Sequence, residues 1–168
     1  TNATWRENAS TGWIDVVQLS GGITQAGLVQ VALDDFGNAV ATWRQADSLG
    51  EETLSAHIEA RSFTAPDTLG SIYQLSPIGE DAFHTTLEAR RKNIVLSNDG
   101  NAAVAWHGFD GEDYRIYVSQ RAPDLTWTVP SAISNLGQHA KVPSLTMGEN
   151  GSYAVSWQRS NGHDWIIQ

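Results

Sequence analysis

A phrase of thirteen residues that ends in Trp occurs three times in this chain of 168 residues, and it limits the folds that the chain can adopt. The copies span residues 31–43, 94–106 and 145–157, and a shortened fourth copy spans 3–5. Each full copy begins with an apolar stretch, passes through a polar turn with Gly at a fixed place, and closes with alternating residues. Repetition of this kind predicts a repeat architecture in which each unit packs on its neighbours.

The last part of each copy has a period of two, which is typical of a β-strand rather than a helix. In the first copy, Ala39, Ala41 and Trp43 share one face of the strand, and Val40 and Thr42 share the other. Both faces carry small or apolar residues, so we expect both to be covered. We expect the repeated Trp to be a large wedge between packed sheets.

The second full unit shows the expected order of strands. Strands are predicted over 94–97 and 102–107, on either side of a tight turn whose positive φ is supplied by Gly100. Further strands are predicted over 114–121 and 127–134. Four short antiparallel strands in each unit are typical of a propeller blade. The sequence therefore predicts an all-β fold, a β-propeller of four-stranded antiparallel blades that is incomplete in this chain.

The repeat also predicts the organisation of the chain. Complete blades are expected over 28–76 and 93–134, with an insertion at 83–92 between them. Partial blades are expected over 1–20 and 142–168. Closed propellers usually have four to eight blades, so we expect another chain or further sequence to close the ring. Without it, an apolar face would remain exposed.

These units resemble repeats that are common in exported bacterial proteins. The shared features are a Gly-Asn-Ala turn before the strand that ends in Trp, a polar loop after it, and a later Trp. They appear here as Gly37-Asn38-Ala39, Gly100-Asn101-Ala102, Asp110-Gly111 and Trp127. Such repeats are similar to sialidase-type β-propeller blades, and the resemblance covers nearly the whole chain. It implies the propeller fold and a secreted or cell-surface bacterial protein, and it leaves the activity open.

Composition excludes several classes of function. The net charge of −9 argues against a nucleic-acid partner, because phosphate binding depends on clustered Lys and Arg. The chain has no Cys, which excludes disulfides, Cys-ligated zinc and a Cys nucleophile. No apolar run is long enough to cross a bilayer, so membrane insertion is not expected.

The candidate site lies in the polar loops. In a propeller, the loops after the second strands and the loops between blades share one end, and here they are rich in carboxylates. Focused negative charge attracts cations and hydroxyl-rich ligands, and an exposed aromatic ring can stack on a sugar. The alternative is that these loops are polar because they face water. The candidate ligand-binding residues are Asp110, Glu112, Asp113, His139, His163, Asp164 and Trp165.

Calcium is the candidate metal, because Asp110, Glu112 and Asp113 offer several carboxylate oxygens, although their spacing differs from that of an EF-hand. The histidines lack the paired spacing of a zinc site, so they are expected at the surface; they are His57, His84, His107, His139 and His163. No catalytic residue is assigned. Glycosidases need two carboxylates about 5–10 Å apart, and nothing in the sequence selects such a pair.

The leading functional hypothesis is a non-catalytic module that binds a carbohydrate or protein ligand through its acidic loop face. One alternative is a glycosidase-type propeller whose catalytic residues lie partly outside this chain. Another is a structural spacer domain.

Overall fold

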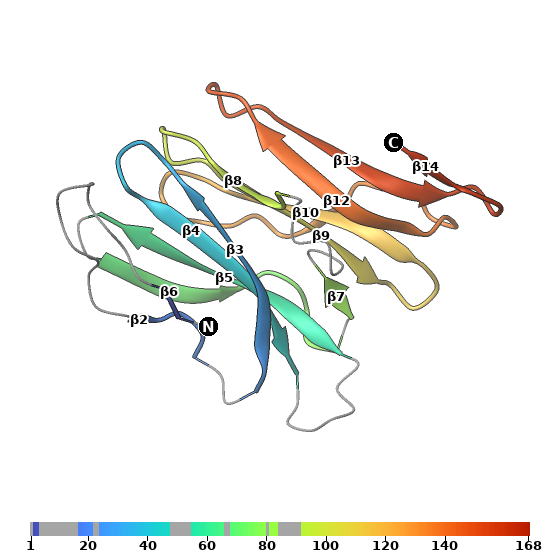
Figure 1. The fold of residues 1–168 in the computed structure, drawn as a ribbon, viewed down its shortest axis with the longest axis horizontal. Coiled ribbons are helices and arrows are strands. Elements are labelled where there is room, and N and C mark those ends of the chain that lie inside the picture. Colours follow the sequence, from blue (N-terminus) through green and yellow to red (C-terminus); the bar gives the residue numbers. More distant parts are fainter. Residues whose placement is uncertain are drawn as a thin grey trace.

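The computed structural model describes residues 2–3, 17–21, 24–47, 55–65, 68–79, 81–83 and 92–168. Within these residues every regular element is a β-strand, and the ladders between strands are antiparallel (Figure 1). The prediction of an all-β fold is therefore confirmed. None of the sheets in the described residues closes on itself. The same residues contain no helix that is long and apolar enough to cross a membrane.

Three sheets follow one another along the chain. The N-terminal sheet contains β3 (Ala26–Leu33), β4 (Ala39–Ala46), β5 (Ala56–Thr64) and β6 (Thr68–Gln74), paired in that order. The middle sheet contains β7 (Ala82–Phe83), β8 (Ile94–Leu96), β9 (Ala102–Phe109), β10 (Tyr114–Arg121) and β11 (Ser131–Ala132). The C-terminal sheet contains β12 (Ala140–Met147), β13 (Tyr153–Ser160) and β14 (Trp165–Ile167), and a short separate ladder pairs β1 (Asn2–Ala3) with β2 (Val17–Gln18).

One strand of the middle sheet is shorter than predicted. In place of a strand over 127–134, Trp127 forms an isolated bridge with Arg121, and the ladder resumes only at β11. Pro130 explains the interruption, because it has no N–H to donate to the neighbouring strand. Much of the insertion predicted at 83–92 and of the partial blade predicted at 1–20 lies outside the described residues.

The sheets stack with a fixed orientation. We call the face that carries Trp43, Trp106 or Trp157 the Trp face of its sheet, and the other the reverse face. Trp106 and its neighbours on the Trp face of the middle sheet share a core with Val40 and Ile58 on the reverse face of the N-terminal sheet. Each sheet thus presents its Trp face to the sheet that precedes it in the chain.

The next interface repeats this arrangement. Leu145 and Val155, on the Trp face of the C-terminal sheet, pack against Val95, Ala103 and Ala105 on the reverse face of the middle sheet. Trp43 and Trp106 are buried as predicted, at 0% and 1% exposed, whereas Trp157 is only partly buried although it faces the middle sheet. Small Ala side chains on the reverse faces let the backbones of adjacent sheets approach closely.

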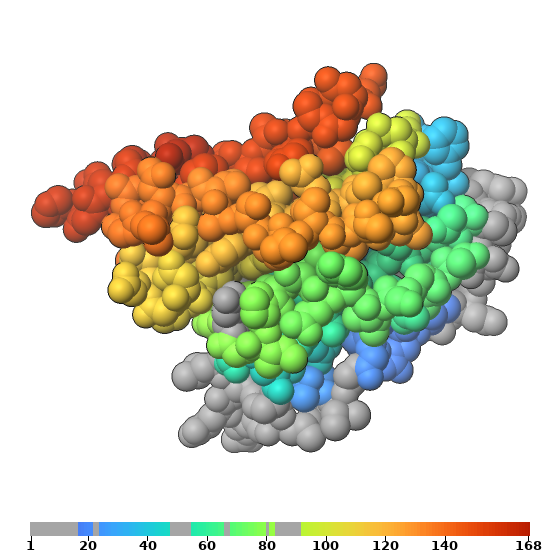
Figure 2. All heavy atoms as spheres, turned by 180° about the vertical axis from the view of Figure 1, so that it is seen from behind, coloured from blue at the N-terminus to red at the C-terminus, as the bar shows by residue number. Residues whose placement is uncertain are grey.

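In each pair of neighbouring sheets, the later sheet contributes its first strands. β7 and β8 contact β3, β4 and β5, and β12 contacts β8, β9 and β10. The last strands of the sheets, β6, β11 and β14, contact mainly their own sheets. Figure 1 shows the middle sheet between the other two, and Figure 2 shows the same order of sheets from behind.

The first strands of the outer two sheets share a β-bulge. The register of β3 shifts between Gly27 and Gln30, and that of β12 shifts between Lys141 and Ser144. The first residue of each bulge has a positive φ, 53° at Leu28 and 56° at Val142. Such a conformation is costly for a branched side chain. In the middle sheet, two separate strands, β7 and β8, pair with β9 where β3 and β12 are each a single strand.

The two end faces of the stack are open in part. On the Trp face of the N-terminal sheet, Leu19 packs on Ala41 and Trp43, whereas Val31 and Leu33 are 59% and 61% exposed. On the reverse face of the C-terminal sheet, Ala154 and Ser156 are exposed, although the corresponding Ala103 and Ala105 are buried. The exposed positions on the end faces thus carry apolar or small residues, as do the equivalent buried positions at the internal interfaces.

Candidate functional site

A second repeated phrase positions the loops at one end of the stack. It reads Leu-Ser or Ile-Ser followed six residues later by Ala, and it occurs at residues 19–26, 75–82 and 133–140. Its Ser links the end of one sheet to the start of the next. The hydroxyl of Ser76 accepts a hydrogen bond from the Ile58 backbone at 2.8 Å, and Ser134 accepts one from Ile116 at 3.0 Å. These segments therefore lie at the same end as the loops that join the second and third strands.

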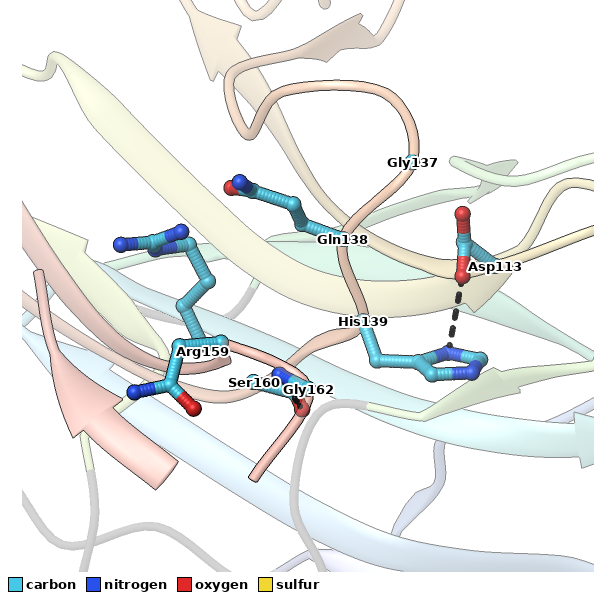
Figure 3. A pocket seen from close by; sticks show the side chains of 8 residues that line it. Asp113, Gly137, Gln138, His139, Arg159, Ser160 and Gly162 are labelled. Atoms are coloured by element: carbon cyan, nitrogen blue, oxygen red, sulfur yellow. Dashed lines mark hydrogen bonds and ion pairs between the residues drawn. The ribbon is translucent and has the colours of Figure 1, made fainter. Parts of the chain in front are cut away.

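A cleft of about 310 Å³ opens at this end, between the middle and C-terminal sheets (Figure 3). Its walls come from the loop before β10, the segment before β12, and the end of β13 with the loop that follows it. Apart from two glycines, the residues that line it have polar side chains. It consists of Asp113, Gly137, Gln138, His139, Arg159, Ser160, Asn161 and Gly162.

Asp113 and His139 meet at one wall of the cleft. His139 Nδ1 lies 3.3 Å from Asp113 Oδ1 and 3.2 Å from the backbone nitrogen of Tyr114. The Tyr114 amide can donate only to an unprotonated Nδ1, whereas the carboxylate can accept only from a protonated one. The tautomer of His139 therefore decides which of the two hydrogen bonds forms. The sequence prediction had placed both residues in the candidate site, and the structure brings them together.

Asp110 and Glu112 lie in the same loop but do not line the cleft. The Asp110 carboxylate accepts hydrogen bonds from the backbone of Asp113 at 2.9 Å and of Glu112 at 3.0 Å. These bonds from Asp113 and then Glu112 lower the pKa of Asp110 below its usual 3.8. The carboxylate of Asp110 thus holds the turn of the loop, with Arg115 Nε 4.0 Å away.

The loop after β13 has the same internal structure. Asn161 Oδ1 accepts hydrogen bonds from the backbone of His163 at 2.9 Å and of Asp164 at 2.7 Å, as Asp110 does in the middle sheet. The side chains of His163 and Asp164 are exposed beside the cleft. Trp165 is 51% exposed and lies on the reverse face of the C-terminal sheet, opposite Ser160. Trp165 therefore faces away from the cleft, and the residues that line the cleft do not include His163 or Asp164.

Arg159 and Gln138 line the cleft and were not among the predicted site residues. Figure 3 shows their side chains extending to one side of the 137–139 segment, while Asp113 and His139 lie on the other. Arg159 Nε and Gln138 Oε1 are buried and have no hydrogen-bond partner. A buried Nε without a hydrogen-bond partner also occurs in Arg115 and Arg121, but those two side chains bond through their terminal nitrogens. Among the described arginines, Arg44, Arg61, Arg115 and Arg121 each have a polar partner for the side chain.

The second repeated phrase was the signal that could have found these residues. Ala26 and Ala140 occupy the same place in it, and they pair with Gln45 and Arg159. Arg159 therefore corresponds to Gln45, and Gln138 corresponds to Thr24. In the N-terminal sheet, the Gln45 amide donates to the backbone oxygen and hydroxyl of Thr24 at 3.0 and 2.5 Å.

The expectation that the histidines lie at the surface is wrong for His57 and His107, which are 7% and 3% exposed. His57 Nδ1 lies 2.5 Å from Asp47 Oδ1, and its Nε2 lies 3.4 Å from Glu59 Oε1. The Glu59 carboxylate also accepts from the indole of Trp43 at 2.8 Å. The polar pairing in this network allowed His57 to be buried. His139 and His163 are exposed as expected, and His84 lies outside the described residues.

In the part of the chain that the structure describes, no three His, Asp or Glu side chains are grouped so as to hold a metal ion. The calcium site expected at Asp110, Glu112 and Asp113 therefore stays a prediction. A comparison with protein-family models finds no match, and a comparison with curated protein sequences finds no significant similarity.

Proposed function

We propose that the three sheets are blades of a β-propeller and that the chain acts as a non-catalytic module that binds carbohydrate through the loop end of the stack. The sheets support this reading because each later sheet packs its first strands and its Trp face on the preceding sheet. Repeated antiparallel sheets that pack in this regular way are the plan of a propeller. The resemblance to repeats of exported bacterial proteins suggests a secreted or cell-surface location.

The observation that carries the binding function is the polar cleft between the middle and C-terminal sheets. Its lining combines a carboxylate, an amide, an imidazole and a guanidinium, which match the alternating donors and acceptors of sugar hydroxyls. Its volume suits one or two sugar rings, since pockets for small ligands begin at about 300 Å³.

Binding is favoured over hydrolysis by the composition of the cleft. Asp113 is the one carboxylate among its lining residues, and its Oδ1 lies against His139. A glycosidase would need a second carboxylate about 5–10 Å away to act as acid, base or nucleophile. Under this proposal, hydrolysis of fluorogenic glycosides is not expected even when the ligand binds.

A glycan array probed with the purified chain, with and without calcium, tests the proposal. Binding to a restricted set of glycans supports it, and dependence on calcium would support the loop carboxylates as metal ligands. The absence of binding to any glycan contradicts it and favours a protein ligand or a structural spacer.

We further propose that sheets of the same repeat cover the open end faces, supplied by another chain or by further sequence. The support is the match between the exposed Ala154 and Ser156 and the buried Ala103 and Ala105. Size-exclusion chromatography with light scattering tests this proposal. Association that is lost on Ser156→Arg supports it, whereas a monomer at all concentrations contradicts cover by another copy.

A further inference from the structure

Two equivalent positions of the repeat carry side chains that bond to each other in the N-terminal sheet but have unpaired polar atoms in the C-terminal sheet. Gln45 and Thr24 bond to each other, so their polar atoms are satisfied within the fold. At the corresponding positions, Arg159 Nε and Gln138 Oε1 are buried and unpaired. The repeat can therefore satisfy polar side chains at these two positions within the fold. The unpaired atoms of the C-terminal sheet need a separate explanation.

The chemistry of the two side chains points to an anionic group. A guanidinium presents several donors in a fixed plane and pairs best with a carboxylate, which it can bind through two parallel hydrogen bonds. Arg159 is partly buried and has no anion among the described residues. The Gln138 side-chain oxygen is a hydrogen-bond acceptor, so it needs a donor such as a hydroxyl. A ligand that carries a carboxylate next to hydroxyl groups would satisfy both.

The charge around the cleft selects among anions. Asp113 is on the opposite wall, and the chain as a whole has a net charge of −9. A doubly charged phosphate would be repelled more strongly than a single carboxylate at the same place. We infer that the cleft recognises the carboxylate of a hexuronate residue in an acidic polysaccharide, with Arg159 binding the carboxylate and Gln138 accepting from a neighbouring hydroxyl. This inference rests on the proposed carbohydrate-binding function.

The test compares two trisaccharides by titration calorimetry with the full chain: trigalacturonate, and its fully methyl-esterified, uncharged form. The free acid is expected to bind at least about tenfold more tightly, since a hydrogen-bonded charge contributes about 1.5–3 kcal/mol. Arg159→Gln should remove this preference. The variant should fold normally, because Arg159 has no hydrogen bond to lose and the N-terminal sheet carries Gln45 at the same position. Trp165→Ala, on the reverse face, is the matched control and should bind as the wild type.

The outcomes separate the two proposals. Equal binding of the acid and the ester, or an unchanged preference in Arg159→Gln, overturns the hexuronate inference and leaves carbohydrate binding in place. Tighter binding of inorganic phosphate than of the acid also overturns it. Failure of the chain to bind either trisaccharide or any glycan on the array overturns both.

Discussion

Asn98 and Asp35 form two hydrogen bonds with each other across the junction of the N-terminal and middle sheets. Asn98 Oδ1 accepts from the Asp35 backbone at 3.0 Å, and Asn98 Nδ2 donates to Asp35 Oδ2 at 2.7 Å. Both residues lie in the first turn of their sheets, so the bonds join equivalent points of successive repeats. A little further along the first strands, the Asn93 backbone donates to Gln30 Oε1 at 2.8 Å. Polar bonds thus fix the relative position of two sheets whose core is apolar.

The buried Trp of the middle sheet is expected to contribute strongly to stability. Trp106→Ala should lower the free energy of unfolding by about 3–5 kcal/mol, because it removes a large side chain from the core between two sheets. Urea denaturation monitored by circular dichroism measures the change. Trp165→Ala is the control and should change stability by less than about 1 kcal/mol, since Trp165 is half exposed. Similar losses in both variants would contradict the stacking described above.

Two corresponding alanines test the fixed orientation of the sheets. Ala103→Leu should destabilise the chain by about 1–3 kcal/mol, because the side chain at this position is 0% exposed and packed against the C-terminal sheet. Ala154→Leu places the same change on the open reverse face and should leave the unfolding free energy of the separate chain nearly unchanged. Thermal unfolding at low protein concentration compares the two. A larger loss in Ala154→Leu would mean that its face is covered within a single chain.

His57 is expected to be structural. His57→Ala removes the imidazole that lies between Asp47 and Glu59, and it should cost about 3 kcal/mol because two carboxylates would stay buried without their partner. Chemical denaturation at neutral pH gives the value. His163→Ala, which alters an exposed side chain, should be neutral by the same assay. A neutral result for His57→Ala would show that the network does not support the fold.

The turn at Asp110 predicts a dependence of stability on acid. Its pKa lies below the usual 3.8 in the folded chain, chiefly because of the hydrogen bonds from Asp113 and Glu112, so the charged form favours folding. This contribution is present above pH 3.8 and is lost as the pH falls through the lower folded pKa. Asp110→Asn should keep the turn, since Asn161 makes the same bonds in the C-terminal sheet.

The check is the free energy of unfolding of both proteins between about pH 2 and pH 5. The wild type should lose more stability than Asp110→Asn as the pH falls over this range. Parallel curves for the two proteins would show that the Asp110 carboxylate does not contribute.

The sequence predicted the strands and the stacking faces well because both depend on local patterns. The alternation around Trp43 and Trp106 determines which face is apolar, and Gly100 has the expected positive φ of 86°. The strand over 127–134 was predicted too long, since Pro130 interrupts its ladder. Whether a Pro interrupts a ladder depends on which neighbouring strand its missing N–H would face, and the local pattern does not show this.

The cleft was harder to predict because it depends on pairing between distant segments. The expectation that the loops share one end grouped Asp113 with His139, and the structure places their side chains 3.3 Å apart. Gln138 and Arg159 were missed because their role follows from the register of β12 against β13, which alternation alone does not reveal. Aligning the second repeated phrase would have placed them opposite Thr24 and Gln45.

The most direct test of the ligand site is an amide NMR titration of the full chain with trigalacturonate. The account predicts that shifts concentrate at Asp113, at residues 137–139 and at residues 159–162, around the cleft of Figure 3. Shifts that gather instead around Trp165 and Ser156 on the reverse face, or no shifts at millimolar ligand, would contradict it.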